Sequence, residues 1–158
     1  MNKKVGKMTL SMALAAALAF APAQAFAAPA TDISGHWAEK VITQWQEKGL
    51  ISGYEDGTFK PDNSVTRAEF VIMLNKALGF TQKGNVTFSD VSANAWYYDA
   101  VAIAVEAGYC AGYEDGTFKP NATITRAEAA VMIAKAKELT ANTEAADKFT
   151  DASRVPAW

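Results

Sequence analysis

The chain has 158 residues, of which 50% are hydrophobic, with 15 Lys and Arg against 17 Asp and Glu, one cysteine and one histidine. A single cysteine excludes an intrachain disulfide. One histidine beside one cysteine excludes a His–Cys zinc cluster and argues against a serine triad. The length suits one domain or a few small repeats that fold together.

Residues 1–27 have the pattern of a secretory signal peptide. Three lysines precede an apolar run over 8–20, and small residues that suit cleavage stand at Ala25 and Ala27. The run is shorter than the roughly 20 residues that span a bilayer. We therefore expect the exported protein to begin between Phe26 and Pro29 and to keep no membrane span. A retained anchor helix is the alternative.

The charge balance changes once this leader is removed. Twelve basic residues then face 17 acidic ones, which gives a net charge of −5. An acidic exported protein is a poor candidate for binding nucleic acid or anionic lipid.

The rest of the chain is a repeat. The nine residues GYEDGTFKP stand at 53–61 and return at 112–120, an offset of 59 residues. An opening Asp and Trp precede each copy, and a TRAE segment follows it, in the same order. The boundaries predict a first repeat at 28–87, a second at 88–148, and the start of a third at 149–158.

Each repeat is predicted to open with a helix. Apolar residues over 37–50 recur close to the 3.6-residue period, and the segment 96–108 repeats the pattern. Gly49 stands where a left-handed residue could close the first of these helices. Cys110 takes the place of Ile51, so we expect a small buried hydrophobe there and not a reactive thiol.

The nonapeptide is predicted to form a compact, ordered loop. Gly53 and Gly57 permit positive φ, and the EDG triplet favours a tight turn. Tyr54 and Phe59 are expected to point inward and hold the loop. Pro61 delays the next helix.

The second helix of each repeat is predicted to begin with a capping box. Thr66 pairs with Glu69, and Thr125 with Glu128, at the spacing that lets each satisfy a backbone N–H of the other. Apolar residues follow in both copies and predict core faces. The expected fold is therefore all-α, built from helix–loop–helix units.

These motifs together resemble a known family. The stretch FSDVSANAWYYDAVAIAVEAGYCAGYEDGTFKPNATITRAEAAVMIAKA is similar to an S-layer homology (SLH) repeat. The resemblance implies repeats around a pseudo-threefold axis, here incomplete. It also implies a secreted protein held at the cell wall without covalent bonds. The implied partner is a secondary cell wall polysaccharide, linked to peptidoglycan and carrying pyruvate ketals, bound in grooves between repeats. It implies no enzyme activity, cofactor or metal.

Two departures from the family pattern affect this expectation. Ala30 stands where the other repeats have Phe88 and Phe149. The third repeat has no loop and no TRAE segment in this chain. If the chain is complete, either two grooves or a homo-oligomer must serve, and self-association is then one of the two predicted solutions. If the chain is a fragment, the missing segment lies downstream.

A pyruvylated sugar requires a cation, a flat apolar face and hydrogen-bond acceptors. Arg67 and Arg126 can grip a carboxylate with two hydrogen bonds from the first turn of a helix. The alternative is that each is solvated or pairs with a nearby carboxylate. The opening tryptophans, Trp37, Trp96 and Trp158, could stack on the sugar or pack in the core. The opening aspartates, Asp32, Asp90 and Asp151, could accept hydrogen bonds from sugar hydroxyls or cap a turn. A weaker group of candidates comes from the loops: Gly53, Lys60, Gly112 and Lys119.

The expected groove joins an arginine to the opening of the next repeat. Arg67 is predicted to lie with Asp90 and Trp96, and Arg126 with Asp151 and Trp158. Burial of Phe149 is expected to hold the segment 149–158 against the second repeat. The rival function is a protein-assembly module of the cell surface that binds no glycan.

Overall fold

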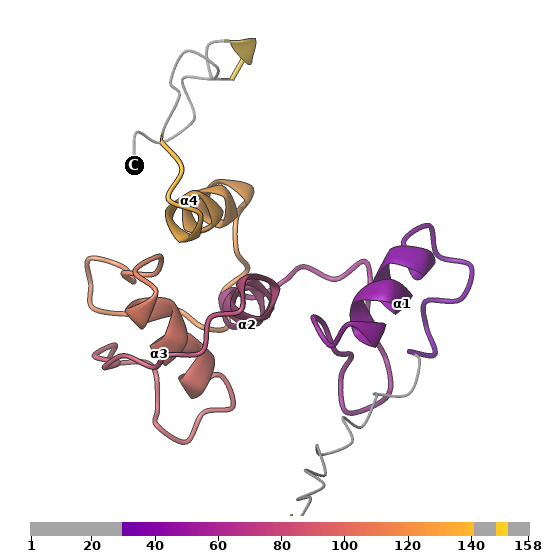
Figure 1. Cartoon of the computed structure of the whole chain (residues 1–158), viewed down its shortest axis with the longest axis horizontal. Helices are drawn as coiled ribbons and strands as arrows, with labels where there is room; N and C mark the ends of the chain where they lie inside the picture. Colours follow the sequence, from indigo (N-terminus) through magenta and orange to yellow (C-terminus); the bar gives the residue numbers. More distant parts are fainter. Residues whose placement is uncertain (1–29, 141–147, 152–158) are drawn as a thin grey trace, which may run out of the picture.

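The structure is a computed structural model that describes residues 30–140 and 148–151. Four helices follow one another in these residues: α1 (Glu39–Glu47), α2 (Arg67–Leu78), α3 (Tyr98–Glu106) and α4 (Arg126–Ala136), as Figure 1 shows. The described residues contain no strand, only an isolated antiparallel bridge between Thr66 and Thr123. The predicted all-α fold is confirmed. The predicted leader 1–27 and Trp158 lie outside the described residues.

The predicted capping boxes start α2 and α4. The hydroxyl of Thr66 accepts from the backbone N–H of Glu69 at 3.2 Å, and the Glu69 carboxylate accepts from the backbone N–H of Thr66 at 2.7 Å. Thr125 and Glu128 make the same two bonds at 3.2 and 2.9 Å. Each box satisfies donors that a helix start leaves unpaired, which explains why the helices begin here.

The first helices begin later than the apolar pattern predicts. α1 starts at Glu39 and α3 at Tyr98, so the opening tryptophans precede them in turns. Trp37 is 89% exposed and Trp96 68% exposed, and neither belongs to the core. A turn forms instead of a helical start because the backbone N–H of Glu39 bonds back to the carbonyl of His36 at 2.9 Å.

The helices pack across the repeat boundary. α2, from the first repeat, packs on α3, from the second, and no other pair of helices in the described residues is in comparably close contact. The amide of Asn75 donates to the carbonyl of Ala100 at 2.9 Å, and the hydroxyl of Tyr109 donates to Asn75 at 2.6 Å. The main core gathers here. It includes Ala68, Val71, Val91, Val101, Ala104, Tyr109, Cys110, Phe118 and Met132.

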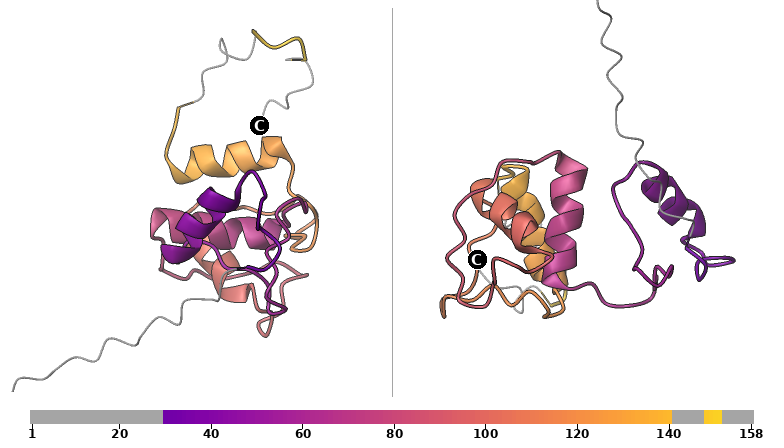
Figure 2. Two further views of the ribbon diagram at one scale, coloured as in Figure 1. Left: turned by 90° about the vertical axis from the view of Figure 1, so that its right-hand side faces the viewer. Right: turned by 90° about the horizontal axis from the view of Figure 1, so that it is seen from below.

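The opening of the first repeat forms a smaller core of its own. Ala30, Ile33 and Ile42 are buried there, with Phe59 packed beside them. In Figure 2 this part stands to one side of the group formed by α2, α3 and α4. On α1 only Ile42 is buried, whereas the neighbouring Trp45 is 41% exposed. The prediction that apolar residues over 37–50 form one buried face is therefore wrong in part, because no helix of the described residues packs closely on α1.

Each nonapeptide loop is held by the opening aspartate of its own repeat. The carboxylate of Asp32 accepts from the backbone N–H groups of Phe59 and Lys60 at 2.7 and 2.8 Å. Asp90 makes the equivalent bonds at 2.8 and 2.7 Å in the second repeat. Gly53 is required by a close approach, since an added Cβ would lie 2.4 Å from the carbonyl oxygen of Thr58. The loop is thus a specified structure, as predicted.

The aromatic residues of the two loops differ in burial. Phe118 is fully buried and stacks on Phe88, with ring centres 5.7 Å apart. Phe59 is only half-buried, because Ala30 stands where Phe88 would pack. Tyr54 is 42% exposed, so the prediction that it points inward is wrong.

Candidate functional site

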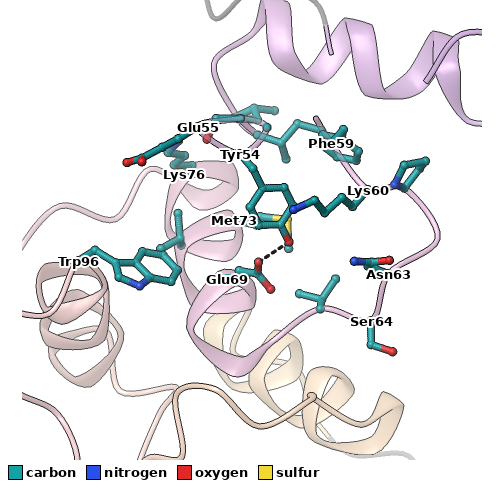
Figure 3. Close-up of a pocket in the computed structure, with 17 residues that line it drawn as sticks. Tyr54, Glu55, Phe59, Lys60, Asn63, Ser64, Glu69, Met73, Lys76 and Trp96 are labelled. Carbon is teal, nitrogen blue, oxygen red and sulfur yellow. Dashed lines mark hydrogen bonds between the residues drawn. The ribbon is translucent and has the colours of Figure 1, made fainter. Parts of the chain in front are cut away.

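Each loop forms a pocket with the second helix of its repeat. The first loop pocket, of about 470 Å³, lies between the loop residues 50–65 and α2, and Trp96 borders it from the second repeat (Figure 3). The second loop pocket, of about 590 Å³, lies between residues 109–119 and α4, and Arg67 borders it from the first repeat. Each pocket therefore combines one repeat with one residue of its neighbour.

Polar contacts define the centre of the first loop pocket. The hydroxyl of Tyr54 donates to the Glu69 carboxylate at 2.7 Å (Figure 3). This bond raises the pKa of Tyr54 above its ordinary value. The ammonium of Lys60 lies 4.2 Å from the centre of the Tyr54 ring and 3.1 Å from Asp56. A cation over an aromatic face is attracted to it.

Trp96 and Lys76 complete this pocket. The indole of Trp96 is 68% exposed and reaches the pocket from the turn before α3. Lys76 lies in the last turn of α2 and is exposed. Among the described residues no carboxylate forms an ion pair with Lys76. The pocket thus offers an aromatic surface and an unpaired ammonium.

Arg67 dominates the second loop pocket. It is only 3% exposed, and its Nε donates to the carbonyl of Phe118 at 2.8 Å while a terminal nitrogen lies 3.1 Å from the Glu128 carboxylate. The guanidinium also lies over the ring of Tyr113, 4.6 Å from its centre. Lys119 lies on that ring as well, at 4.1 Å. Arg67 therefore joins the two repeats.

The surroundings of Arg67 shift the pKa values of two neighbouring groups, Glu128 and Cys110. Partial burial acts to raise the pKa of Glu128, but bonds from Tyr113 and Thr125 and the charge of Arg67 outweigh it, so the pKa is lowered. Burial raises the pKa of the Cys110 thiol, which is 5% exposed. Cys110 is a buried small hydrophobe, as predicted.

The structure divides the predicted groove between the two pockets. Arg67 and Asp90 both bond to Phe118, through its carbonyl and its N–H respectively. Trp96, however, lines the first loop pocket and not the one that holds Arg67. The predicted grouping of Arg67 with Trp96 is wrong, because the arginine turns into the loop of the next repeat and the tryptophan turns back to the loop before it.

The other predicted site residues lie in several places. Gly53 and Lys60 line the first loop pocket, and Gly112 and Lys119 the second. Asp32 and Asp90 hold their loops, and Trp37 lines neither pocket. Arg126 and Asp151 are exposed.

Phe149 is 67% exposed, so its predicted burial against the second repeat is wrong. The described residues 148–151 give it no apolar partner in the core. The predicted partner of Arg126, Trp158, lies outside the described residues.

Sequence reasoning missed the second-helix residues that face the loops. Lys76 and Lys135 line the two pockets at equivalent positions. The carboxylates of Glu69 and Glu128 also serve each loop tyrosine, beyond their capping role. The sequence did contain a signal for these residues, because the lysine and the glutamate recur 59 residues apart, at the same offset as the nonapeptide.

None of the described residues form a group of three or more His, Cys, Asp or Glu that could hold a metal ion. The described part of the chain also contains no helix that is long and apolar enough to cross a membrane.

Known proteins share most of this chain. The chain is 39% identical over 126 residues to the surface-layer 125 kDa protein of Lysinibacillus sphaericus, which covers 80% of the chain. It is 38% identical over 122 residues to a cellulosome-anchoring protein of Acetivibrio thermocellus, covering 73% of the chain. It is 35% identical over 133 residues to exoglucanase XynX of the same organism, covering 80%.

These relatives are longer proteins. The matched stretch spans 10, 27 and 12% of their respective lengths. Several relatives are named as surface-layer or cell-wall proteins, which agrees with the predicted cell-surface localisation. The family described as S-layer homology domain matches residues 31–71 and 87–130, more than half of the chain. The chain therefore belongs to the S-layer homology (SLH) domain family.

Proposed function

We propose that this chain anchors an exported protein to the cell envelope by binding an anionic polysaccharide of the cell wall, with pyruvate ketals as its charged groups. One observation carries the proposal. In the first loop pocket the exposed ring of Trp96 lies beside Lys76, a lysine of the second helix that has no ion pair among the described residues. Lys135 is the equivalent lysine in the second loop pocket, and it too has no ion pair in the described part of the chain.

The chemistry of the pockets suits such a ligand. The exposed face of Trp96 can stack on the apolar C–H surface of a sugar ring. An ammonium that no carboxylate neutralises can pair with the carboxylate of a ketal. Arg126, exposed in the first turn of α4, is a proposed contact of the same kind in a single, unassociated chain. Arg67 supports the second loop pocket as part of its wall.

The relatives support a non-catalytic role for the shared stretch. It occurs in proteins named for a surface layer, for anchoring a cellulosome and for a glucanase activity. A segment common to proteins with such different names is best explained by a common place of attachment.

The test measures binding to isolated cell-wall sacculi by co-sedimentation. Lys76→Ala should weaken binding about tenfold or more, because a charge-assisted bond contributes about 1.5–3 kcal/mol. Trp96→Ala should also weaken binding, because it removes the aromatic face on which the sugar stacks. Lys48→Ala removes an exposed lysine at the end of α1, outside both pockets, and should leave binding unchanged.

Extraction of the polysaccharide separates this function from its rival. Binding should disappear when the sacculi are stripped of their wall polysaccharide. Binding that survives extraction would favour a protein-assembly module and contradict the proposal.

A further inference from the structure

The two loop pockets are equivalent by sequence but differ in one occupant. In the second, the Glu128 carboxylate oxygen Oε1 receives both the Tyr113 hydroxyl and the guanidinium of Arg67. In the first, the matching oxygen of Glu69 receives the Tyr54 hydroxyl, and no arginine from the described part of the chain borders the pocket. The first loop pocket therefore has the features that bind an arginine in the second.

The chain carries a matching arginine on another surface. Arg126 occupies the position in the second repeat that Arg67 occupies in the first. Arg67 is 3% exposed, whereas Arg126 is exposed. Within residues 30–140 and 148–151, no hydrogen bond or ion pair engages the side chain of Arg126.

The backbone around Arg67 shows how such an arginine docks. The N–H of Arg67 donates to the carbonyl of Ala122 at 2.9 Å, and the N–H of Ala68 donates to that of Pro120 at 3.0 Å. These bonds join the start of α2 to the segment after the next loop. By sequence, the backbone N–H groups of Arg126 and Ala127 are equivalent to these two donors. The backbone carbonyls of Asn63 and Pro61 are equivalent to the two acceptors.

The helix faces are complementary in size. Where α2 packs on α3, α2 brings the large residues Phe70 and Leu74 to the core, and α3 brings the small residues Ala100 and Ala104. At most of the equivalent positions the sizes are exchanged. α4 has Ala129 and Ala130 where α2 has Phe70 and Val71, and α1 has Val41 and Trp45 where α3 has Ala100 and Ala104. Ile133 of α4, 41% exposed, stays as large as its equivalent Leu74.

Both of these faces are open. Val41 is 53% exposed and Trp45 41% exposed on α1, and Ala130 is exposed on α4. A large residue exposed on one surface and small residues exposed on another can pack together without overfilling the contact.

From these observations we infer that two copies of this chain associate head to tail. The start of α4 in one copy docks on the first repeat of the next, with its Arg126 in the first loop pocket between Tyr54 and Glu69. The contact repeats between molecules the one that α2 makes with the second repeat. Because the two surfaces differ, it is heterologous.

The association also completes the second loop pocket. Trp96 borders the first loop pocket because its repeat follows that pocket along the chain. Trp37 is the equivalent residue and is 89% exposed. Docking of α4 on the first repeat of another copy brings that copy's Trp37 to the second loop pocket, so that each pocket gains the arginine or tryptophan it lacks.

The experiment uses residues 28–158, purified without cell-wall material, and measures mass by sedimentation velocity over a range of concentrations. The unchanged chain should sediment as species heavier than a monomer. Arg126→Ala removes the docking residue but keeps the acceptor surface, whereas Trp45→Ala or Val41→Lys changes the acceptor surface but keeps Arg126. Each variant alone should be a monomer, with unchanged helicity by circular dichroism.

Mixing the variants tests the direction of the contact. An equimolar mixture of Arg126→Ala with Trp45→Ala should form a dimer that grows no further, because one intact surface of each kind remains. Lys48→Ala should associate as the unchanged chain does. A monomeric unchanged chain, single variants that associate normally, or a mixture that stays monomeric would each overturn the inference. None of these results depends on a polysaccharide, so the proposed anchoring function stands or fails separately.

Discussion

At the scale of single residues, the two TRAE arginines have opposite roles despite identical local sequence. Arg67 is buried between repeats and bonded at both ends of its guanidinium, whereas Arg126 is exposed. The sequence predicted one role for both, because the identity of a residue's neighbours in space depends on which repeat follows it. Arg67 pairs with the carboxylate of Glu128, which agrees with the alternative prediction that it pairs with a nearby carboxylate.

The matched pair of arginines gives a prediction on stability. Arg67→Ala should lower the free energy of unfolding by about 3 kcal/mol, because it breaks a buried ion pair and leaves Glu128 without its cation. Arg126→Ala should change it by less than about 0.5 kcal/mol. Urea denaturation measures both. Arg67→Lys should recover only part of the loss, since an ammonium lacks the fork that spans Phe118 and Glu128. Equal effects of the two alanine variants would contradict the assignment.

The loops and caps predict how stability depends on pH. The pKa of Asp56 is lowered to about 2, chiefly by the hydroxyl and N–H of Thr58, and the pKa values of Asp115, Glu69 and Glu128 are also lowered. In the unfolded chain these groups titrate near pH 4. The unfolded state therefore binds more protons as the pH falls below about 4.5, and stability decreases toward pH 2.

Thermal denaturation between pH 5 and pH 2 tests this dependence. The double variant Asp56→Asn, Asp115→Asn should have a flatter profile than the unchanged chain. A midpoint that stays constant over this range, or a variant as steep as the unchanged chain, would contradict the role assigned to the loop carboxylates.

At the scale of the elements, the second helix of each repeat could be predicted closely and the first could not. The capping boxes at Thr66 and Thr125 are local, so their sequence determines where α2 and α4 begin. The starts of α1 and α3 depend on turns before them, and their buried faces depend on which helix packs there. An apolar period over 37–50 could not distinguish a face that meets α2 from one that meets nothing in the described residues.

Asn75 tests the packing of α2 on α3. It is 4% exposed and connects Ala100 to Tyr109 through its amide. Asn75→Ala should lower the free energy of unfolding by about 1–3 kcal/mol, because it removes two hydrogen bonds across the contact and leaves the Tyr109 hydroxyl only its 3.4 Å bond to the carbonyl of Val71. The measurement is again urea denaturation, with Ala134→Asn as a reference at the equivalent position on α4. An Asn75→Ala variant as stable as the unchanged chain would show that this contact does not hold the repeats together.

At the scale of the whole molecule, the repeat order was evident from the sequence but the pairing of repeats was not. The nonapeptide and the TRAE segments identified the family and the all-α fold. They predicted grooves between neighbouring repeats but not which residues meet in each, since Arg67 and Trp96 approach different loops. That arrangement follows from the packing of α2 on α3, which places the second loop beside the start of α2.

The central claim is that the pockets recognise the charged ketals of a wall polysaccharide. Calorimetric titration of residues 28–158 with purified wall polymer, intact and chemically stripped of pyruvate, tests it most directly. We expect binding to the intact polymer and at least about tenfold weaker binding to the stripped one, because each lost carboxylate removes a charge-assisted contact of about 1.5–3 kcal/mol. Equal affinity for the two polymers, or no binding to the intact one, would contradict it.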